Sequence, residues 1–360
     1  MLLLTPDFPP DRGGIQRLVH GLVCHLPEIR SRLVTCAAMS SEPVAVPPEC
    51  EVRRGRRWPG RALALTSLNV HSIGQALAFR PNVTFCAHIV ASPAAWVIAV
   101  LLGTPYVLYV HGKELMRRPR LARFACRHAT AVLANSRYTR DLVLPYLSSS
   151  TPALVVPPGV EPAPRRDPPA GPPTILTVAR LDDRYKGHDV LLRALPLVRA
   201  RVPDARLVIV GGGSLLPVYQ AIAGALGVRE ATQFCGAVDD AALERCFRAA
   251  HVFALVSRIT PNGAEGFGIV YLEAGIRGIP AVAGNAAGAK DAVEDEVNGL
   301  LVDPEDHVAV ADALCRLLVD PGHATALGRA GAERAQRYVW PAIAASVGDA
   351  LTRAALARRP

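Results

Sequence analysis

A proline-rich segment at residues 157–173 constrains the fold more than any other feature of the sequence, because it separates two halves with the same pattern. Eight of its seventeen residues are proline, which lacks a backbone N–H donor and disrupts the interior of helices and strands. The segment is therefore predicted to be a linker. A chain of 360 residues is long enough for about two domains, each with its own core.

Short apolar runs alternate with amphipathic stretches in both halves, which is the pattern of parallel sheets covered by helices. Strands are predicted at 2–5, 33–37, 83–86, 106–110, 131–134 and 154–156, and then at 175–179, 207–210, 233–235, 252–256, 280–283 and 300–302. Helices are predicted near 15–26, 69–79, 92–102, 120–128 and 136–147, and then near 188–201, 215–226, 240–249, 268–277, 306–319, 322–337 and 342–357. The expected fold class is α/β, with two doubly wound, Rossmann-like domains facing each other across a cleft. Ligands of such sheets bind beyond the carboxyl ends of the strands.

Composition excludes several classes of protein. With 50% hydrophobic residues the chain is not expected to be disordered, and no run of about 18 apolar residues predicts a membrane-spanning helix. The N-terminal apolar run is interrupted by Pro6 and has no basic residues before it, so it does not resemble a signal peptide. The eight cysteines show no metal-ligand spacing and are expected to be reduced thiols, which indicates a cytoplasmic protein.

The net charge of +9 lies entirely in the first half of the chain. Residues 1–164 carry 18 Lys and Arg against 9 Asp and Glu, whereas residues 165–360 carry 22 of each. These arginines are either solvated surface residues or contacts to something acidic. An anionic membrane surface, on the inner face, is favoured over nucleic acid, because basic residues and Trp suit that interface and no nucleic-acid-binding signature is present. Two clusters carry much of the excess: Arg53, Arg54, Arg56, Arg57 and Arg61 around Trp58, and then Arg117, Arg118, Arg120, Arg123 and Arg127.

The segment Ser257–Ala274, SRITPNGAEGFGIVYLEA, contains the most informative motif. Glu265 is expected in a loop after a buried strand, and Glu273 about two helical turns further on, roughly 12 Å away at 1.5 Å per residue. The backbone N–H groups of Gly266–Gly268 would favour phosphate or sugar oxygens. The alternative is that both glutamates are surface residues favoured by the dipole near a helix N-terminus.

This segment resembles the E-x7-E signature of retaining, nucleotide-sugar-dependent glycosyltransferases of family 4, which have the two-domain GT-B fold. Six other stretches fit the same family in the expected order, so the resemblance covers nearly the whole chain. Within the family, the sequence is most similar to mannosyltransferases that act on phosphatidylinositol lipids. The six stretches are Pro9–Gln16, Val110–Leu115, Asn135–Arg140, Pro157–Val160, Val178–Asp189 and Gly299–Asp306.

The resemblance implies a donor site in the second half of the chain. Arg180 and Lys186 would bind the diphosphate, since phosphoryl oxygens suit a guanidinium fork and an ammonium charge. Glu273 would accept hydrogen bonds from the ribose hydroxyls, and Glu265 would hold the sugar, helped by the backbone N–H groups of Gly266, Phe267 and Gly268. Backbone of the loops 211–214 and 236–238 would approach the nucleoside.

The resemblance also implies functional residues in the first half. Gly13 and Gly14 precede a helix and let the backbone approach the donor phosphates or the acceptor, with Gly14 assigned to the donor and Gly13 to the acceptor. Asp11 and Arg12 flank these glycines and are further acceptor candidates. His111 follows an apolar strand and would lie near the reacting sugar. The catalytic set would be His111, Glu265, Arg180 and Lys186.

No metal site and no cofactor are expected, apart from the sugar nucleotide as co-substrate. Histidines and carboxylates are scattered without ligand spacing, and the resemblance implies that Arg180 and Lys186 replace a cation at the leaving diphosphate. The leaving phosphate would help to deprotonate the acceptor hydroxyl on the same face of the sugar, so retention requires no glycosyl-enzyme intermediate.

The expected function is a hexosyltransferase that moves a sugar from GDP-mannose or a UDP-hexose to a lipid or cell-envelope glycan precursor. The alternatives are tailoring of a small natural product, epimerisation of a sugar nucleotide on the same fold, and a basic membrane-surface protein without catalysis. The expected domains are an acceptor domain at 1–163, a donor domain at 164–337 and a final helix at 338–360 that returns to the first domain.

Overall fold

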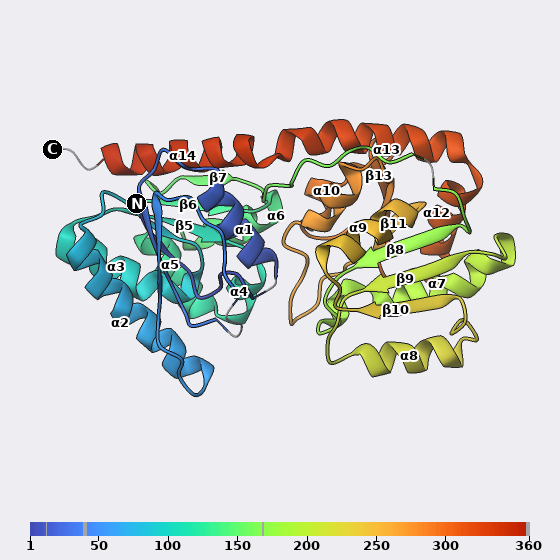
Figure 1. Cartoon of the computed structure of the whole chain (residues 1–360), viewed down its shortest axis with the longest axis horizontal. Helices are drawn as coiled ribbons and strands as arrows, with labels where there is room; N and C mark the ends of the chain where they lie inside the picture. Colours follow the sequence, from blue (N-terminus) through green and yellow to red (C-terminus); the bar gives the residue numbers. More distant parts are fainter. Residues whose placement is uncertain (12, 39–41, 168, 358–360) are drawn as a thin grey trace. The chain divides into compact units, whose positions relative to one another are not determined.

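The computed structural model describes the chain except residues 12, 39–41, 168 and 358–360. It divides into two compact units, Met1–Gly159 with the segment that starts at Trp340, and Val160–Val339. Each unit contains one parallel β-sheet with helices packed around it (Figure 1). The predicted α/β class, with two doubly wound sheets, is confirmed. Among the described residues, no helix combines the length and apolarity needed to cross a membrane.

The first unit is built on a seven-stranded sheet with the order β3-β2-β1-β4-β5-β6-β7. Its strands are β1 (Leu2–Leu4), β2 (Ser31–Thr35), β3 (Cys50–Arg54), β4 (Thr84–Cys86), β5 (Tyr106–Val110), β6 (Ala131–Ala134) and β7 (Ala153–Val155). Its helices are α1 (Gly14–Cys24), α2 (Arg61–Phe79), α3 (Ser92–Leu102), α4 (Lys113–Arg117), α5 (Pro119–His128), α6 (Arg137–Val143) and α14 (Trp340–Leu356), with short 3₁₀ turns at Ile89–Ala91 and Leu144–Tyr146.

The second unit is built on a six-stranded sheet with the order β10-β9-β8-β11-β12-β13. Its strands are β8 (Thr174–Val178), β9 (Arg206–Val210), β10 (Thr232–Gly236), β11 (Val252–Leu255), β12 (Ala281–Gly284) and β13 (Gly299–Val302). Its helices are α7 (His188–Arg201), α8 (Leu216–Ala225), α9 (Asp240–Ala249), α10 (Ile269–Gly275), α11 (Ala289–Ala292), α12 (His307–Val319) and α13 (Pro321–Ala335), with 3₁₀ turns η3 (Arg184–Lys186) and η4 (Gln336–Tyr338).

The central strands are buried on both faces, which explains their continuous apolar sequences. All five residues of β5, YVLYV, are buried. Its two tyrosines are tolerated there because each hydroxyl finds an acceptor: Tyr106 donates to the carbonyl of Ala125 at 2.7 Å and Tyr109 to that of Val156 at 2.6 Å. Helices on both sides then complete two separate apolar layers around the sheet.

The sequence did not predict β3, α4 or α11, and it predicted the start of α2 eight residues too late. β3 is an edge strand rich in charge, held by parallel pairing with β2 and by the Arg32–Glu51 ion pair at 2.6 Å. The first turns of α2 carry exposed Leu63 among other apolar residues, so no amphipathic pattern marks them. α4 and α11 are too short to show a helical period.

Trp340, the first residue of α14, packs closely against two glycines of the first unit. Its side chain is 3% exposed and stacks on the imidazole of His25, with 6.1 Å between ring centroids. The indole lies directly against the Cα positions of Gly21 in α1 and Gly159, where a Cβ atom would overlap with it. The two glycines therefore form the slot that receives this ring.

We predict that Gly21→Ala lowers the free energy of unfolding by about 1–3 kcal/mol, because the new methyl group overlaps with the Trp340 ring. The matched control is Gly74→Ala, in the interior of α2, where a Cβ meets nothing within 4 Å. That change should stabilise the protein by about 0.4–1 kcal/mol through the reduced entropy of the unfolded chain. Urea unfolding followed by circular dichroism measures both, and equal stability of the two variants would contradict the slot.

Candidate active site

Three loops at the carboxyl edge of the second sheet are joined through their backbones. Leu181, after β8, donates its N–H to the carbonyl of Gly212 at 2.9 Å and accepts from Leu215 at 2.8 Å. Gly211, after β9, donates to Gly236 at the end of β10 at 2.8 Å. The loops predicted to approach the nucleoside therefore form one connected surface of backbone groups.

Glycine is required where these loops cross. Gly211 and Gly213 have φ angles of 138° and 157°, and a Cβ on either would overlap with the backbone of the loop after β8. Asp182 fixes the same crossing, since its Oδ1 accepts from the backbone N–H of Ser214 at 2.8 Å and from its hydroxyl at 3.1 Å. Asp182 lies within the motif Val178–Asp189, which by itself predicts no role for it. Its supporting role depends on a contact between residues 32 positions apart.

Lys186 and Glu265 form a largely buried ion pair. The Nζ atom of Lys186, in η3, lies 2.6 Å from Oε2 of Glu265, in the loop between β11 and α10. Their side chains are 17% and 11% exposed. Burial alone would lower the pKa of Lys186, but Glu265, together with Tyr185 and Asp183, outweighs it, and the pKa lies above its ordinary value. Two predicted site residues that are 79 positions apart in sequence are thus brought into contact.

Arg180 belongs to the same electrostatic cluster. It is exposed in the loop after β8. Burial raises the pKa of the Tyr185 phenol, which is also affected by the charges of Lys186, Glu265, Asp183 and Arg180. The Lys186 ammonium lies 5.2 Å from the centroid of the Tyr185 ring. Two cations and two carboxylates therefore act on a single buried aromatic ring.

The loop that carries Glu265 is held by backbone contacts. Gly288 donates its N–H to the Glu265 carbonyl at 3.0 Å, and a Cβ on Gly288 would overlap with the carbonyl of Gly266. Gly268 has a φ of 86° and precedes α10, where a side chain would strike Tyr271. Phe267 is 2% exposed and packs near Tyr338, with ring centroids 5.8 Å apart. The buried Phe267 side chain anchors the loop, so this residue could contact a ligand only through its backbone.

Glu273 lies in α10, which runs from Ile269 to Gly275 and is shorter than predicted. Its side chain is half-buried, and its carbonyl accepts from Arg277 Nη1 at 2.6 Å. Arg277 in turn is paired with Glu244 of α9, at 2.7 Å. Glu273 therefore stands on a helix that is fixed to its neighbour, and its role toward a ribose stays a prediction.

His111 occupies the carboxyl end of β5 in the first unit. Its Nε2 lies 2.8 Å from the carbonyl of Ala87, so this nitrogen carries the proton and Nδ1 of the neutral ring is an acceptor. Its backbone N–H donates to Glu114 Oε1 at 2.6 Å, and its carbonyl accepts from Asn135 at 3.2 Å. The neighbouring His88, 6.1 Å away, is neutral because burial and the nearby His111 lower its pKa to about 3.

The loop between β1 and α1 contains the predicted acceptor residues. Gly13 is extended, with a φ of 166°, and Gly14 starts α1 with open space where a Cβ would lie. Asp11 is half-buried in the same loop, and Arg12 lies outside the described residues. Sequence reasoning missed how this loop is supported: Arg54 of β3 donates to the carbonyl of Pro9 and packs over Phe8, 5.7 Å from the ring centroid.

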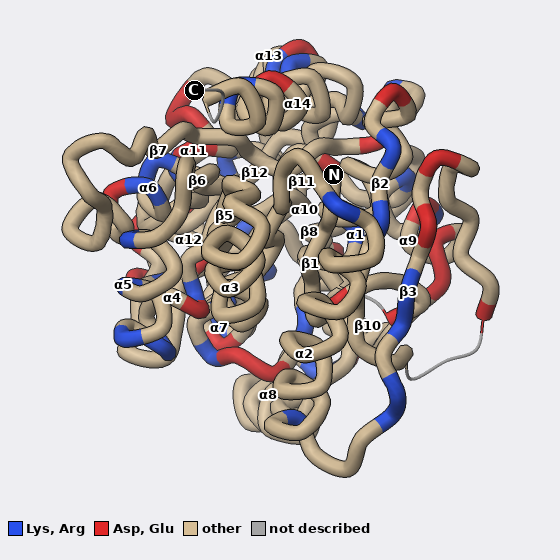
Figure 2. Tube along the Cα trace, turned by 90° about the vertical axis from the view of Figure 1, so that its left-hand side faces the viewer, with Lys and Arg blue, Asp and Glu red and all other residues tan. Residues whose placement is uncertain are grey.

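Some arginines of the two clusters have partners within the fold. Arg53 forms an ion pair with Glu51, and Arg54 donates to the carbonyl of Pro9, so part of the positive charge near Trp58 is engaged within the fold. Figure 2 shows the basic positions of β3 and the following loop along one side of the trace, and those of α5 elsewhere on the same unit. In the described part of the chain, no three His, Cys, Asp or Glu side chains gather as metal ligands would.

Comparison with known proteins places this chain in a family. A model described as Glycosyltransferase Family 4 matches residues 12–164, and one described as Glycosyl transferases group 1 matches residues 163–334. The GDP-mannose-dependent alpha-(1-6)-phosphatidylinositol monomannoside mannosyltransferase of Mycolicibacterium smegmatis is 34% identical over 98% of both chains.

Two solved structures have the same fold. Sucrose-phosphate synthase from Thermosynechococcus elongatus gives a TM-score of 0.87 at 22% identity, with 99% of this chain and 98% of that chain covered. HepE from Anabaena, solved with UDP and glucose, gives a TM-score of 0.79 at 20% identity over 98% of each chain. Both units of the present chain are therefore organised as in these glycosyltransferase structures.

We predict that Glu265→Gln lowers the pKa of Lys186, because the largest contribution that opposes burial would be lost. In the wild type the raised pKa means that the pair's contribution to stability is complete below the ordinary lysine pKa of about 10.4 and is lost as pH rises through the folded value. The chain has only three lysines, so NMR of ¹³C-methylated lysines resolves Lys186 from the internal controls Lys113 and Lys290. An unchanged Lys186 titration would contradict the assigned pair.

Proposed function

Because the chain belongs to the group 1, family 4 glycosyltransferases and is a hexosyltransferase that uses a nucleotide sugar, we propose that it transfers mannose from GDP-mannose to a phosphatidylinositol-type glycolipid with retention of configuration. The observation that carries the proposal is the 34% identity, over nearly both full lengths, to an enzyme named for this donor and acceptor. The Lys186–Glu265 pair supports it, because it is built at the position where the family resemblance expects the donor.

Arg180 and Lys186 bind the donor diphosphate in this proposal. An ammonium has three N–H donors, so Lys186 can keep its hydrogen bond to Glu265 while it donates to phosphate oxygens. Glu265 thereby orients the cation before the donor arrives, and its second oxygen accepts hydrogen bonds from the sugar hydroxyls. Glu273 accepts from the ribose hydroxyls, and the backbone N–H groups of 266–268 help to hold the sugar.

The reaction breaks the bond between the anomeric carbon and the diphosphate oxygen, and the electron pair leaves with GDP. Lys186 and Arg180 stabilise the negative charge that develops on the diphosphate, so the proposed mechanism needs no metal ion. The acceptor hydroxyl attacks from the same face and passes its proton to a leaving phosphate oxygen. His111 lies near the reacting sugar in this scheme, where its Nδ1 accepts a hydrogen bond from a sugar hydroxyl.

The acceptor proposal also includes contact with a membrane surface. Leu63, Val70 and Leu77 are exposed at intervals of seven residues along α2, so they lie on one face of that helix. Val100 and Leu101 are exposed on α3, which packs against α2. Together with the arginines that precede α2 and those of α5, this apolar surface suits the interface of an anionic bilayer.

We predict that Lys186→Ala and Arg180→Ala each lower kcat/KM with GDP-mannose by about 100-fold, as loss of a charged contact to the transferring group does. The matched control is Arg184→Ala, which removes an exposed cation from the same 3₁₀ turn and should change kcat/KM less than about twofold. Thermal shifts with GDP-mannose, UDP-glucose and a dTDP-sugar measure donor binding separately, since a bound ligand raises the apparent stability. Full activity of both variants would refute the site.

We predict that the protein floats with vesicles that contain phosphatidylglycerol and not with vesicles of phosphatidylcholine alone, because its exposed arginines are attracted to anionic headgroups. Val100→Glu should reduce this binding several-fold, since a carboxylate would replace a side chain of the apolar surface. Val319→Glu is the control: Val319 is 65% exposed, against 64% for Val100, but lies at the end of α12 in the other unit. Equal losses, or binding that salt does not weaken, would argue against this surface.

A further inference from the structure

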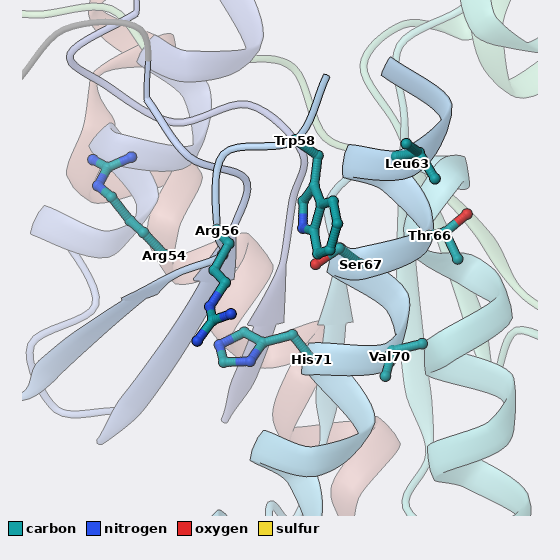
Figure 3. Close-up of a pocket in the computed structure, with 9 residues that line it drawn as sticks. Arg54, Arg56, Trp58, Leu63, Thr66, Ser67, Val70 and His71 are labelled. Carbon is teal, nitrogen blue, oxygen red and sulfur yellow. The ribbon is translucent and has the colours of Figure 1, made fainter. Parts of the chain in front are cut away.

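A cavity of about 620 Å³ lies in the first unit, between α2 and the segment that leads into it from β3 (Figure 3). From the β3 side it is lined by Arg54, Arg56 and Trp58, and from α2 chiefly by Ser67, Val70 and His71. Its volume falls within the range of about 300–1,000 Å³ that is typical of small-molecule sites. None of the residues assigned to sugar transfer above lines it.

The cavity combines an apolar wall with a cationic corner. In Figure 3 the Trp58 indole lies against α2 beside Ser67, while the Arg56 guanidinium and the His71 imidazole point toward one another. The Nε2 atom of His71 is buried and meets no hydrogen-bond partner among the residues that the structure describes. A guanidinium and an imidazole that face each other present N–H donors, and an anionic oxygen between them would satisfy both.

The position of the cavity links it to the predicted acceptor loop. Arg54 and Arg56 lie at the carboxyl end of β3, where Gly55 donates to the carbonyl of Thr35 at 2.8 Å. The β1–α1 loop leaves the same edge of this sheet. The side chain of Arg54 spans the two, since it lines the cavity and donates to the carbonyl of Pro9. A ligand with its head at Asp11 and Gly13 could therefore extend its remainder into the cavity.

We propose that this cavity binds the diacylglycerol phosphate part of the acceptor lipid. The phosphodiester lies between Arg56 and His71, and one acyl chain lies against Trp58 and the adjoining face of α2. The inference rests on the proposed function and deepens it, because it assigns a separate binding site to the lipid part of the acceptor. An inorganic phosphate would contact only Arg56 and His71, whereas a phospholipid would also bury the apolar surface of Trp58 and α2.

The test is calorimetric titration of the full chain with monomeric dioctanoyl phosphatidylinositol, with its deacylated form glycerophosphoinositol, and with inorganic phosphate. Wild type should bind the dioctanoyl lipid at least about tenfold more tightly than either water-soluble compound, since each buried methylene adds affinity. Ser67→Trp, which fills the cavity, and Arg56→Ala, at an exposed position, should each weaken lipid binding about tenfold. Val319→Ser is the control, because Val319 is 65% exposed at the end of α12 and does not line the cavity.

Three results would overturn the proposal: no lipid binding by wild type, equal binding by wild type and both cavity variants, or equal binding of the lipid and inorganic phosphate. Because Arg56→Ala changes only an exposed side chain, it remains informative if Ser67→Trp fails to fold. The titration contains no sugar nucleotide, so its failure concerns the cavity alone. The proposed reaction fails separately, if no mannose is transferred from GDP-mannose to the intact lipid.

Discussion

The ion pair between Lys186 and Glu265 is the interaction on which the candidate active site depends. It joins the turn after β8 to the loop before α10, so two segments far apart in sequence hold one charged group each at a fixed distance of 2.6 Å. Removing one partner of a pair this well buried would leave an uncompensated charge, at a cost of about 3–5 kcal/mol. The pair therefore constrains both loops, and it favours the protonated form of the Lys186 ammonium.

The glycines make this arrangement sterically possible. Gly213 and Gly288 stand where two backbones approach more closely than any side chain allows, one beside the β8 loop and one beside the Glu265 loop. The side chain of Phe267 then anchors the Glu265 loop, because it is buried in the core of the second unit. The result is a surface of backbone N–H and C=O groups with few mobile side chains, on which polar ligand groups can be held at little entropic cost.

Local sequence patterns predicted those parts of the fold that local forces determine. The strands 106–110 and 131–134 and the helix 188–201 agree with the structure residue for residue, because buried apolar runs and a long periodic helix carry strong signals. β3 was missed because an edge strand held by ion pairs looks like a loop. In the site, the family motif identified Lys186 and Glu265, but no pattern in the sequence indicates that they touch. The supporting roles of Asp182, Gly288 and Arg54 arise only from tertiary contacts.

The two halves of the chain differ in how their charged side chains are arranged. The second half carries 22 positive and 22 negative side chains, and there Lys186 and Arg180 lie with Glu265 and Asp183 around the phenol of Tyr185. The first half holds the excess, but part of it is engaged within the fold, as in the ion pairs of Arg32 and Arg53 with Glu51. What remains available gathers before α2 and along α5, beside exposed apolar residues of α2 and α3. Charge next to apolar surface fits an anionic amphiphile better than a purely polar ligand, which agrees with the proposed lipid acceptor.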